Sequence, residues 1–301
     1  MAEIVNFYES SQKNIEKTIL LIVGFIVFMI FFAYVIGGLI GDSTSLVFFA
    51  FIFSLGSSFV SYYYSDKIVL SLSKAKPVTK EEHFDFYTVV ENISIGTGIP
   101  MPKLYVIDDT AMNAFATGRD KNHSAVVATT GLLSRLERSE IEGVMAHELS
   151  HIGNKDILLM SVVAVLVGTI VLVVDWVWRI RFFGGDDNNK NSNGIFLIVA
   201  VVSAIVAPII AQVIKLAISR QREFLADATA VKFTRNPNGL ISALGKLNQD
   251  SEKLEVANRA TAHLYITNPF KVNSAGFGKN INLLFSTHPP IEDRITRLSN
   301  M

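Results

Sequence analysis

The chain has 301 residues, of which half are hydrophobic and 18% are charged, and 27 basic residues balance 27 acidic ones. This composition is too apolar for an ordinary soluble enzyme, and the zero net charge gives no sign of a nucleic-acid-binding protein. There is no cysteine. Disulfides and thiolate ligands are therefore excluded, and any metal site must use His, Asp or Glu.

The first 65 residues contain two uncharged apolar runs. Residues 18–40 form the first, which at ~1.5 Å per residue is long enough to cross a bilayer core of about 30 Å. A cleaved signal peptide is the alternative, but the run is too long and no small-residue cleavage site follows it. Residues 46–64 form the second run, and its closing tyrosines suit a membrane interface. A short turn joins the two runs, so residues 1–65 are predicted to be a transmembrane hairpin.

Two further runs, residues 157–174 and 195–214, are predicted to form a second transmembrane hairpin within residues 157–218. The third run is short and the fourth contains Pro208, so helices buried in protein are the alternative. Four membrane-spanning helices are expected if both hairpins cross.

The soluble part of the chain is split into residues 66–156 and residues 219–301. Lysines precede the first run and follow the second, whereas the turn between these runs has none. The positive-inside rule then predicts that the N-terminus and both soluble pieces are cytoplasmic. The loop between the third and fourth runs is then expected outside the cytoplasm. It contains three basic residues, which is a mild exception to the rule: Arg179, Arg181 and Lys190.

The segment SEIEGVMAHELSHI, which begins at Ser139, carries the strongest chemical signal. Ser139 and Glu142 have the spacing of a capping box, so a helix is expected to start there. On this helix His147 and His151 are four residues apart and share a face, so both rings can reach one metal ion. Glu148 is then placed to take a proton from a water molecule at the metal. This is the H-E-x-x-H pattern of zinc proteases. A surface helix with two solvated histidines is the alternative.

A catalytic zinc uses three protein ligands and keeps one position open. The best candidate for the third ligand is Glu223, and Asp227, four residues later, can hold the second nitrogen of a ligand histidine. An ordinary charged helix face is the alternative. The position of this segment beside the membrane, on the same expected side as the histidines, favours the metal site.

Several motifs in this order resemble the HtpX family of bacterial membrane zinc endopeptidases, relatives of the prenyl-protein-processing membrane proteases of eukaryotes. The resemblance covers nearly the whole chain and rests on MNAFATG (112–118), AVVATTGLL (125–133), HELSHI, RQREFLAD and STHPPIEDRI (286–295). It implies an inner-membrane enzyme of protein quality control and the stress response, which acts on misfolded or damaged membrane proteins. It also implies one Zn²⁺ per chain, held by His147, His151 and Glu223, with Glu148 as the catalytic base.

Three more residues are candidates for contacts with substrate or oxyanion. Asn113 resembles substrate-contacting asparagines of related proteases and precedes a possible edge strand, to which a peptide could add. A turn Asn before a buried strand is the alternative. The resemblance places His288 and Arg294 near the active site, where a cation could stabilise the oxyanion. Alternatively, Arg294 pairs with an acid and His288 caps a helix.

Together these patterns predict a mainly α-helical integral membrane protein with four transmembrane helices and a small α+β zincin-type metalloprotease domain. Its expected partners are protein substrates and membrane lipid, with no nucleic acid. Two rivals stay open. A non-proteolytic scaffold with a structural zinc would prefer four protein ligands and would not need Glu148. A zinc hydrolase acting on a lipid or lipopeptide is the other.

Overall fold

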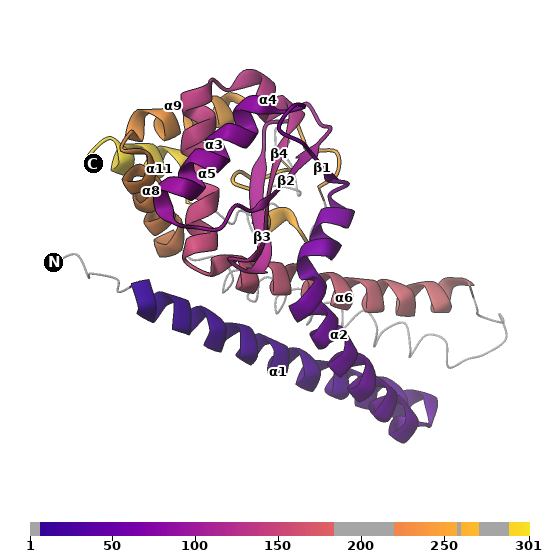
Figure 1. The fold of residues 1–301 in the computed structure, drawn as a ribbon. Coiled ribbons are helices and arrows are strands. Elements are labelled where there is room, and N and C mark those ends of the chain that lie inside the picture. The colour runs from indigo at the N-terminus through magenta and orange to yellow at the C-terminus, as the bar shows by residue number, and fades with distance from the viewer. Residues whose placement is uncertain (1–6, 184–219, 258–259, 271–288) are drawn as a thin grey trace.

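The computed structural model describes residues 7–183, 220–257, 260–270 and 289–301 (Figure 1). The fourth apolar run and His288 lie outside these residues. Most of the described helices and all four strands gather at one end of three long helices.

The three long helices are α1 (Phe7–Ile40), α2 (Ser43–Leu72) and α6 (Asp156–Phe183), and each is long and apolar enough to cross a membrane. The α1–α2 turn is tight because the Asp42 carboxylate caps α2 by accepting from the Ser45 N–H at 3.1 Å. In α6, 61% of the 18-residue apolar stretch that identifies the span is buried, compared with 17% of the corresponding stretches in α1 and in α2. Three of the four apolar runs therefore form helices of spanning length, with α6 the most enclosed.

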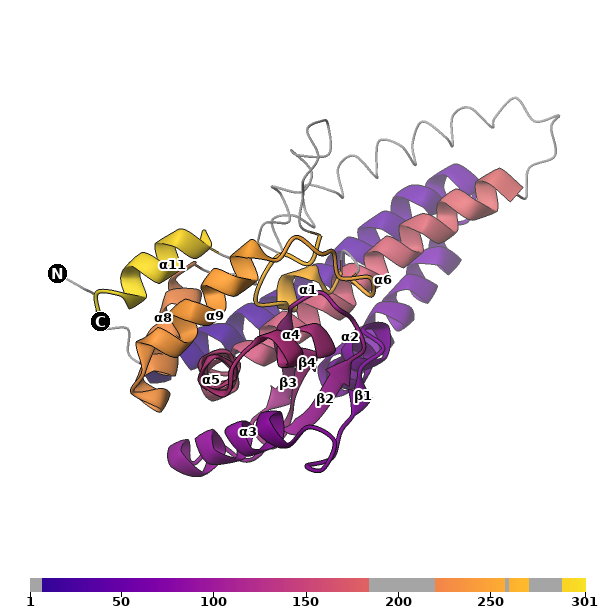
Figure 2. The ribbon, with the colours of Figure 1, turned by 90° about the horizontal axis from the view of Figure 1, so that it is seen from above.

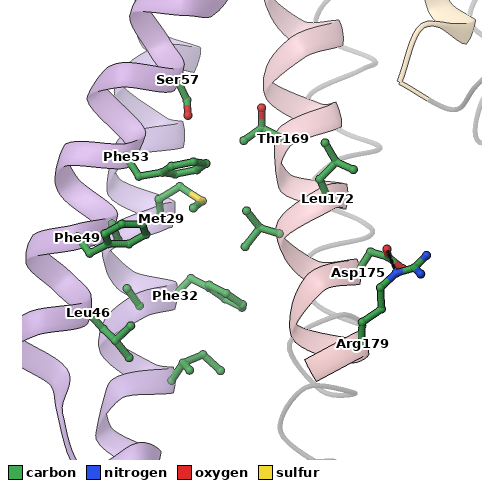
Figure 3. A pocket seen from close by; sticks show the side chains of 14 residues that line it. Met29, Phe32, Leu46, Phe49, Phe53, Ser57, Thr169, Leu172, Asp175 and Arg179 are labelled. Carbon is green, nitrogen blue, oxygen red and sulfur yellow. Dashed lines mark hydrogen bonds and ion pairs between the residues drawn. The ribbon is translucent and has the colours of Figure 1, made fainter. Parts of the chain in front are cut away.

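Between these helices lies a cavity of about 770 Å³ with almost entirely apolar walls (Figure 3). Phe32 and Phe49 line it from α1 and α2, and Leu172 lines it from α6. An ion pair between Asp175 and Arg179, at 2.7 Å, stands at one end. None of the predicted metal ligands borders this cavity, so it is distinct from the site predicted from sequence.

The sheet has four strands in the order β1-β2-β4-β3. These are β1 (Lys76–Pro77), β2 (Lys103–Ile107), β3 (Ala114–Asp120) and β4 (His123–Thr129). Strands β3 and β4 form an antiparallel hairpin, β2 and β4 run parallel, and β1 is antiparallel to β2. The prediction that the strand after Asn113 lies at a sheet edge is confirmed, because β3 ends the strand order.

Helix α5 (Arg138–Gly153) carries the H-E-x-x-H motif, and the remaining described helices lie in the same part of the molecule. They are α3 (Phe84–Thr97), α4 (Thr130–Arg135), α8 (Arg220–Thr234), α9 (Pro237–Gln249), the 3₁₀ turn η1 (Ala262–Leu264) and α11 (Ile291–Leu298). Figure 2 shows α5 nearly end-on, with α3 and the sheet on one side and α8 and α9 on the other.

The apolar face of α5 is the centre of the main hydrophobic core. Val144, Leu149 and Ile152 are fully buried there. Helix α9 crosses close to Gly143, because a Cβ at this position would lie 2.6 Å from the Leu240 nitrogen. Packing on several sides holds α5 rigidly, which suits a helix that must keep functional side chains in register.

The start of α5 differs from the sequence prediction. The predicted capping box between Ser139 and Glu142 is wrong, because the box forms between Glu137 and Glu140 and the helix begins at Arg138. Glu140 accepts from the Glu137 N–H at 2.7 Å, and it is also held by Lys246, at 2.7 Å. This long-range partner, supplied by α9, favours the earlier start.

Candidate metal centre

Two neighbouring helices bring the predicted site residues together. Helix α5 carries His147, Glu148 and His151, and helix α8 carries Glu223 and Asp227. All five side chains are buried. Because the two helices pack against each other, residues far apart in the sequence line one enclosed space.

The ligand atoms of His147, His151 and Glu223 all lie within 4.8 Å of one another. The Nε2 atoms of the two histidines are 3.2 Å apart, and the Glu223 carboxylate lies 3.7 Å from both, with Oε2 facing His147 and Oε1 facing His151. Tetrahedral coordination with Zn–N bonds of about 2.0–2.1 Å separates two nitrogens by roughly 3.3 Å. The donor set and its spacing therefore fit a single zinc ion.

The hydrogen bonds made by the Nδ1 atoms of the two rings leave both Nε2 atoms available as metal ligands. The Nδ1 atom of His147 lies 2.9 Å from Asp227, and that of His151 lies 3.0 Å from Asp156. An ionised carboxylate only accepts, so each Nδ1 carries the hydrogen. Each Nε2 lone pair is then directed at the shared space, as metal-binding histidines require.

On the His147 side, the supporting carboxylate is itself held by an arginine. Arg294 of α11 is fully buried and donates to both oxygens of Asp227, from Nε at 2.9 Å and from Nη2 at 2.7 Å. Burial lowers the pKa of His147 to about 4, and the charge of Arg294 acts in the same direction. Burial alone would raise the pKa of Asp227, but Arg294 and His147 outweigh it and lower the pKa to about 2. His147 is therefore a neutral imidazole beside an ionised Asp227.

On the His151 side, the support comes from the membrane helices. Asp156, at the start of α6, accepts from the Asn14 side chain of α1 at 2.7 Å, and Asn14 accepts from Arg222 of α8 at 2.9 Å. Burial alone would lower the pKa of His151, but the Asp156 hydrogen bond and the charges of Glu223 and Asp156 raise it to about 9. Without a metal these surroundings favour a protonated ring, and a metal ion would take the place of the proton on Nε2.

The sequence analysis missed Asp156, Asn14 and Arg222 as parts of this site. A signal for the first was present, since an acid at the start of an apolar span is costly unless it has a partner. Nothing in the sequence pairs Asp156 with Asn14, which lies 142 residues away.

Asn113 contacts the chain itself. Its side chain is buried and donates to the Thr267 carbonyl at 3.1 Å, and the Ala114 carbonyl accepts from the Ile266 N–H at 2.9 Å. Further along β3, the Gly118 N–H donates to Ser161 at 3.3 Å. The edge next to Asn113 is therefore already occupied, and a peptide could pair there only after the residues around Ile266 had moved.

Arg294 was expected either to pair with an acid or to stabilise an oxyanion. It does pair with an acid, which is Asp227 of α8. Its Nη1 atom is buried and has no hydrogen-bond partner among the described residues. The Nη1 donor of this guanidinium is therefore available. The guanidinium lies close to His147, since its other terminal nitrogen, Nη2, is 3.3 Å from Nδ1 of that ring.

The other described histidines make ordinary structural contacts, as expected from their sequence context. His263 lies 3.0 Å from the Met160 carbonyl, His123 lies 2.8 Å from Asp120, and His83 occupies the N-cap of α3.

Comparisons with known proteins agree with this site. Residues 82–301 match peptidase family M48. A protease HtpX homolog from Dictyoglomus thermophilum is 45% identical over 300 residues, covering 98% of this chain and 95% of that protein. A homolog of the same name from Thermoanaerobacter pseudethanolicus is 41% identical over 299 residues, covering 98% and 97%. A third, from Streptococcus uberis, is 40% identical over 301 residues, covering 98% and 99%.

Among solved structures, the crystal structure of S. mikatae Ste24p superposes with a TM-score of 0.50 at 19% identity. The match covers 97% of this chain and 67% of that protein. At this identity the likeness concerns the fold alone.

Proposed function

The chain belongs to peptidase family M48 and is a metallopeptidase, and on this basis we propose that it is a membrane-bound zinc endopeptidase that cleaves misfolded or damaged membrane proteins. One observation carries the proposal. Two histidine Nε2 atoms and a glutamate converge in a buried space, on the helix that also carries Glu148.

His147, His151 and Glu223 are the proposed zinc ligands. When bound, the ion would polarise the scissile carbonyl and lower the pKa of a water molecule. The absence of cysteine and the single carboxylate among three ligands favour a catalytic site with an open position over a closed structural site.

Glu148 is the proposed general base. It follows His147 directly on α5 and is buried with the ligands. Its carboxylate takes a proton from the attacking water and later delivers it to the leaving amine nitrogen. Asp227 and Asp156 keep the two histidine rings in the tautomer that leaves Nε2 free.

Arg294 is proposed to stabilise the developing oxyanion. The guanidinium is held on one side by Asp227, while the buried Nη1 has no partner among the described residues. A fixed cationic donor in an enclosed site stabilises charge that develops in the transition state. Asn113 keeps the role of a substrate contact as a proposal, which requires the residues around Thr267 to move. His288 keeps its proposed role near the active site on the family resemblance alone.

The proposed topology has four spans. Residues 1–65 and 157–218 are the two hairpins, and residues 66–156 and 219–301 are two parts of one cytosolic zincin-type domain. Asn14 and Asp156 are the first residues of two candidate membrane spans and lie beside the proposed metal centre, which supports a position of the centre next to one membrane face. The lysine distribution favours the cytoplasmic face of a bacterial inner membrane.

The central experiment is purification in detergent with a chelator, followed by zinc addition. Cleavage of an unfolded protein is expected to appear only with zinc. Cleavage of a lipid or lipopeptide without cleavage of protein would favour the rival hydrolase, and tight zinc without hydrolysis would favour a scaffold.

Sidedness has its own test, because the chain has no cysteine of its own. An impermeant thiol reagent applied to intact cells should label Asn191→Cys, in the predicted outer loop, and should leave Ser251→Cys unlabelled. Labelling of Ser251→Cys would contradict a cytosolic metal site.

A further inference from the structure

A second hollow, of about 370 Å³, lies where α2 meets the sheet. One wall is formed by α2 between Tyr63 and Leu70, and the others by β2 and by the turn between β3 and β4. It shares no lining residue with the metal centre or with the apolar cavity between the long helices.

This hollow lies at the border between the apolar and the polar part of α2. The uncharged run of the helix closes with exposed tyrosines, including Tyr63 and Tyr64, and the next charged residues are Asp66 and Lys67. Tyrosines followed by charged residues mark the level of lipid headgroups in membrane-spanning helices. The hollow therefore opens at the depth where phosphate groups are found.

The lining of the hollow is predominantly cationic. Lys67, Lys103 and Arg119 border it from three different elements, against one carboxylate, that of Asp66. Among the described residues, neither lysine is part of an ion pair. Because Asp120 is paired with Arg119, a smaller net positive charge remains in the hollow, and it favours the binding of an anion.

The arginine of this set is already held in place. Arg119 donates from Nε to Asp120 at 3.2 Å, and its Nη2 lies 3.1 Å from Nε2 of His123. Its guanidinium also lies over the Tyr63 ring, 5.3 Å from the centroid. Because these contacts fix the side chain beforehand, little conformational entropy is lost when an anion binds.

Apolar surface continues from the hollow along α2. Phe59 packs against Tyr63 in a tilted arrangement, with ring centroids 4.7 Å apart, and Phe59 and Val60 are both exposed. A ligand with a phosphate in the hollow could lay acyl chains along this face. A free phosphate ion would make no use of it.

We propose that this hollow binds the phosphate group of an anionic glycerophospholipid, with Lys67, Lys103 and Arg119 as cationic contacts. The bound lipid ties the sheet, through β2 and the β3–β4 turn, to the membrane surface beside α2. The site is separate from the proposed peptidase chemistry, and binding can be measured without any cleavage assay.

The test uses the full-length protein in a nonionic detergent and native mass spectrometry. Phosphatidylglycerol, phosphatidylcholine with the same acyl chains, or phosphatidylglycerol with excess inorganic phosphate is added, and the retained lipid is counted. Wild-type protein should retain phosphatidylglycerol in preference to phosphatidylcholine. A basic residue near an anionic lipid contributes about 5-fold in affinity, so Lys67→Gln with Lys103→Gln should weaken retention about 25-fold.

The matched control is Lys74→Gln with Lys76→Gln, two exposed lysines just beyond α2 that do not line the hollow. This variant removes the same charge and should retain the lipid like wild type. Equal weakening in both double variants, or equal retention of phosphatidylcholine by wild type, would overturn the site. Displacement of the lipid by inorganic phosphate at similar concentrations would show that the ligand is a free ion and would overturn the lipid assignment. Circular dichroism and thermal unfolding show whether both double variants are folded.

Discussion

The two histidines of the H-E-x-x-H helix lie one turn apart, yet their supports come from different regions of the molecule. The His147 ring is held by Asp227 and, behind it, by the fully buried Arg294, both from the C-terminal helices. The His151 ring is held by Asp156 and, behind it, by Asn14, both at the starts of membrane helices.

This difference shows that neither region builds the metal centre alone. The C-terminal region uses a buried ion pair, in which a charge is left without its partner if one side is lost. The membrane region also contains a cation, Arg222, but it is only partly buried and donates to the neutral amide of Asn14, so the loss of Asp156 is expected to leave a smaller uncompensated charge. The two regions are therefore expected to respond differently to equivalent substitutions, although both reach the same metal ligands.

The largest effect on the cleavage rate is expected at Glu148, which is not one of the residues that hold the His147 and His151 rings. Glu148→Gln removes the proposed base but no proposed ligand, so it should lower the cleavage rate by about 10²–10⁴-fold and keep near-stoichiometric zinc. His147→Ala should lose both activity and zinc. Metal analysis of each purified variant, beside a cleavage assay, separates the two effects. Retention of most of the rate in Glu148→Gln would reject the mechanism.

Asp227→Asn should be the most damaging change in the supports. Removing one partner of a buried ion pair costs about 3–5 kcal/mol, because Arg294 would stay buried without its counter-charge. Zinc affinity or turnover should fall by about 10–100-fold as well. Thermal unfolding of the chelator-treated protein measures the first effect, and zinc titration the second. Unchanged values for both would remove Asp227 from the site.

Asp156→Asn should weaken zinc binding to a similar degree, by about 10–100-fold, since it replaces the charged acceptor of the His151 ring by a neutral amide. Its effect on stability should be smaller, about 1–3 kcal/mol, because Asp156 bonds to the neutral Asn14 and the nearby cation, Arg222, is only partly buried, unlike Arg294. Comparing the stability losses of Asp156→Asn and Asp227→Asn in the same unfolding assay tests the difference between the two supports directly. A larger loss in Asp156→Asn would contradict the expected order.

Asn14→Leu should have the smallest effect on zinc affinity, because it acts on His151 only through Asp156. The loss of its hydrogen bonds to Asp156 and Arg222 is expected to cost about 1.5–3 kcal/mol in stability. A few-fold decrease in zinc affinity should accompany it. Gln12→Leu is the control, since Gln12 lies on the same helix and its only described side-chain contact is an exposed one with Glu16. Equal changes in both variants would mean that α1 supports the centre only by packing.

Much of the site followed from local patterns. The positions of His147, Glu148 and His151 are fixed relative to one another by the helical repeat, so the order of residues was enough to predict a shared metal. Glu223 and Asp227 followed from the same argument on a second helix. Long apolar runs were likewise enough to predict α1, α2 and α6, since span length depends on the chain alone.

Contacts between distant segments were decided by the tertiary structure. Arg294 could have paired with neighbouring acids, but the packing of α11 near α8 gives it Asp227. In the same way the edge of β3 was expected to be open, but Ile266 bonds to Ala114. The helical or strand repeat specifies which residues share a face, whereas the partner on the next element depends on how the whole chain packs. The sequence by itself therefore determined the proposed metal ligands and the helices of spanning length, and only the fold decided that Asn14 and Asp156 support His151 from the side of these helices.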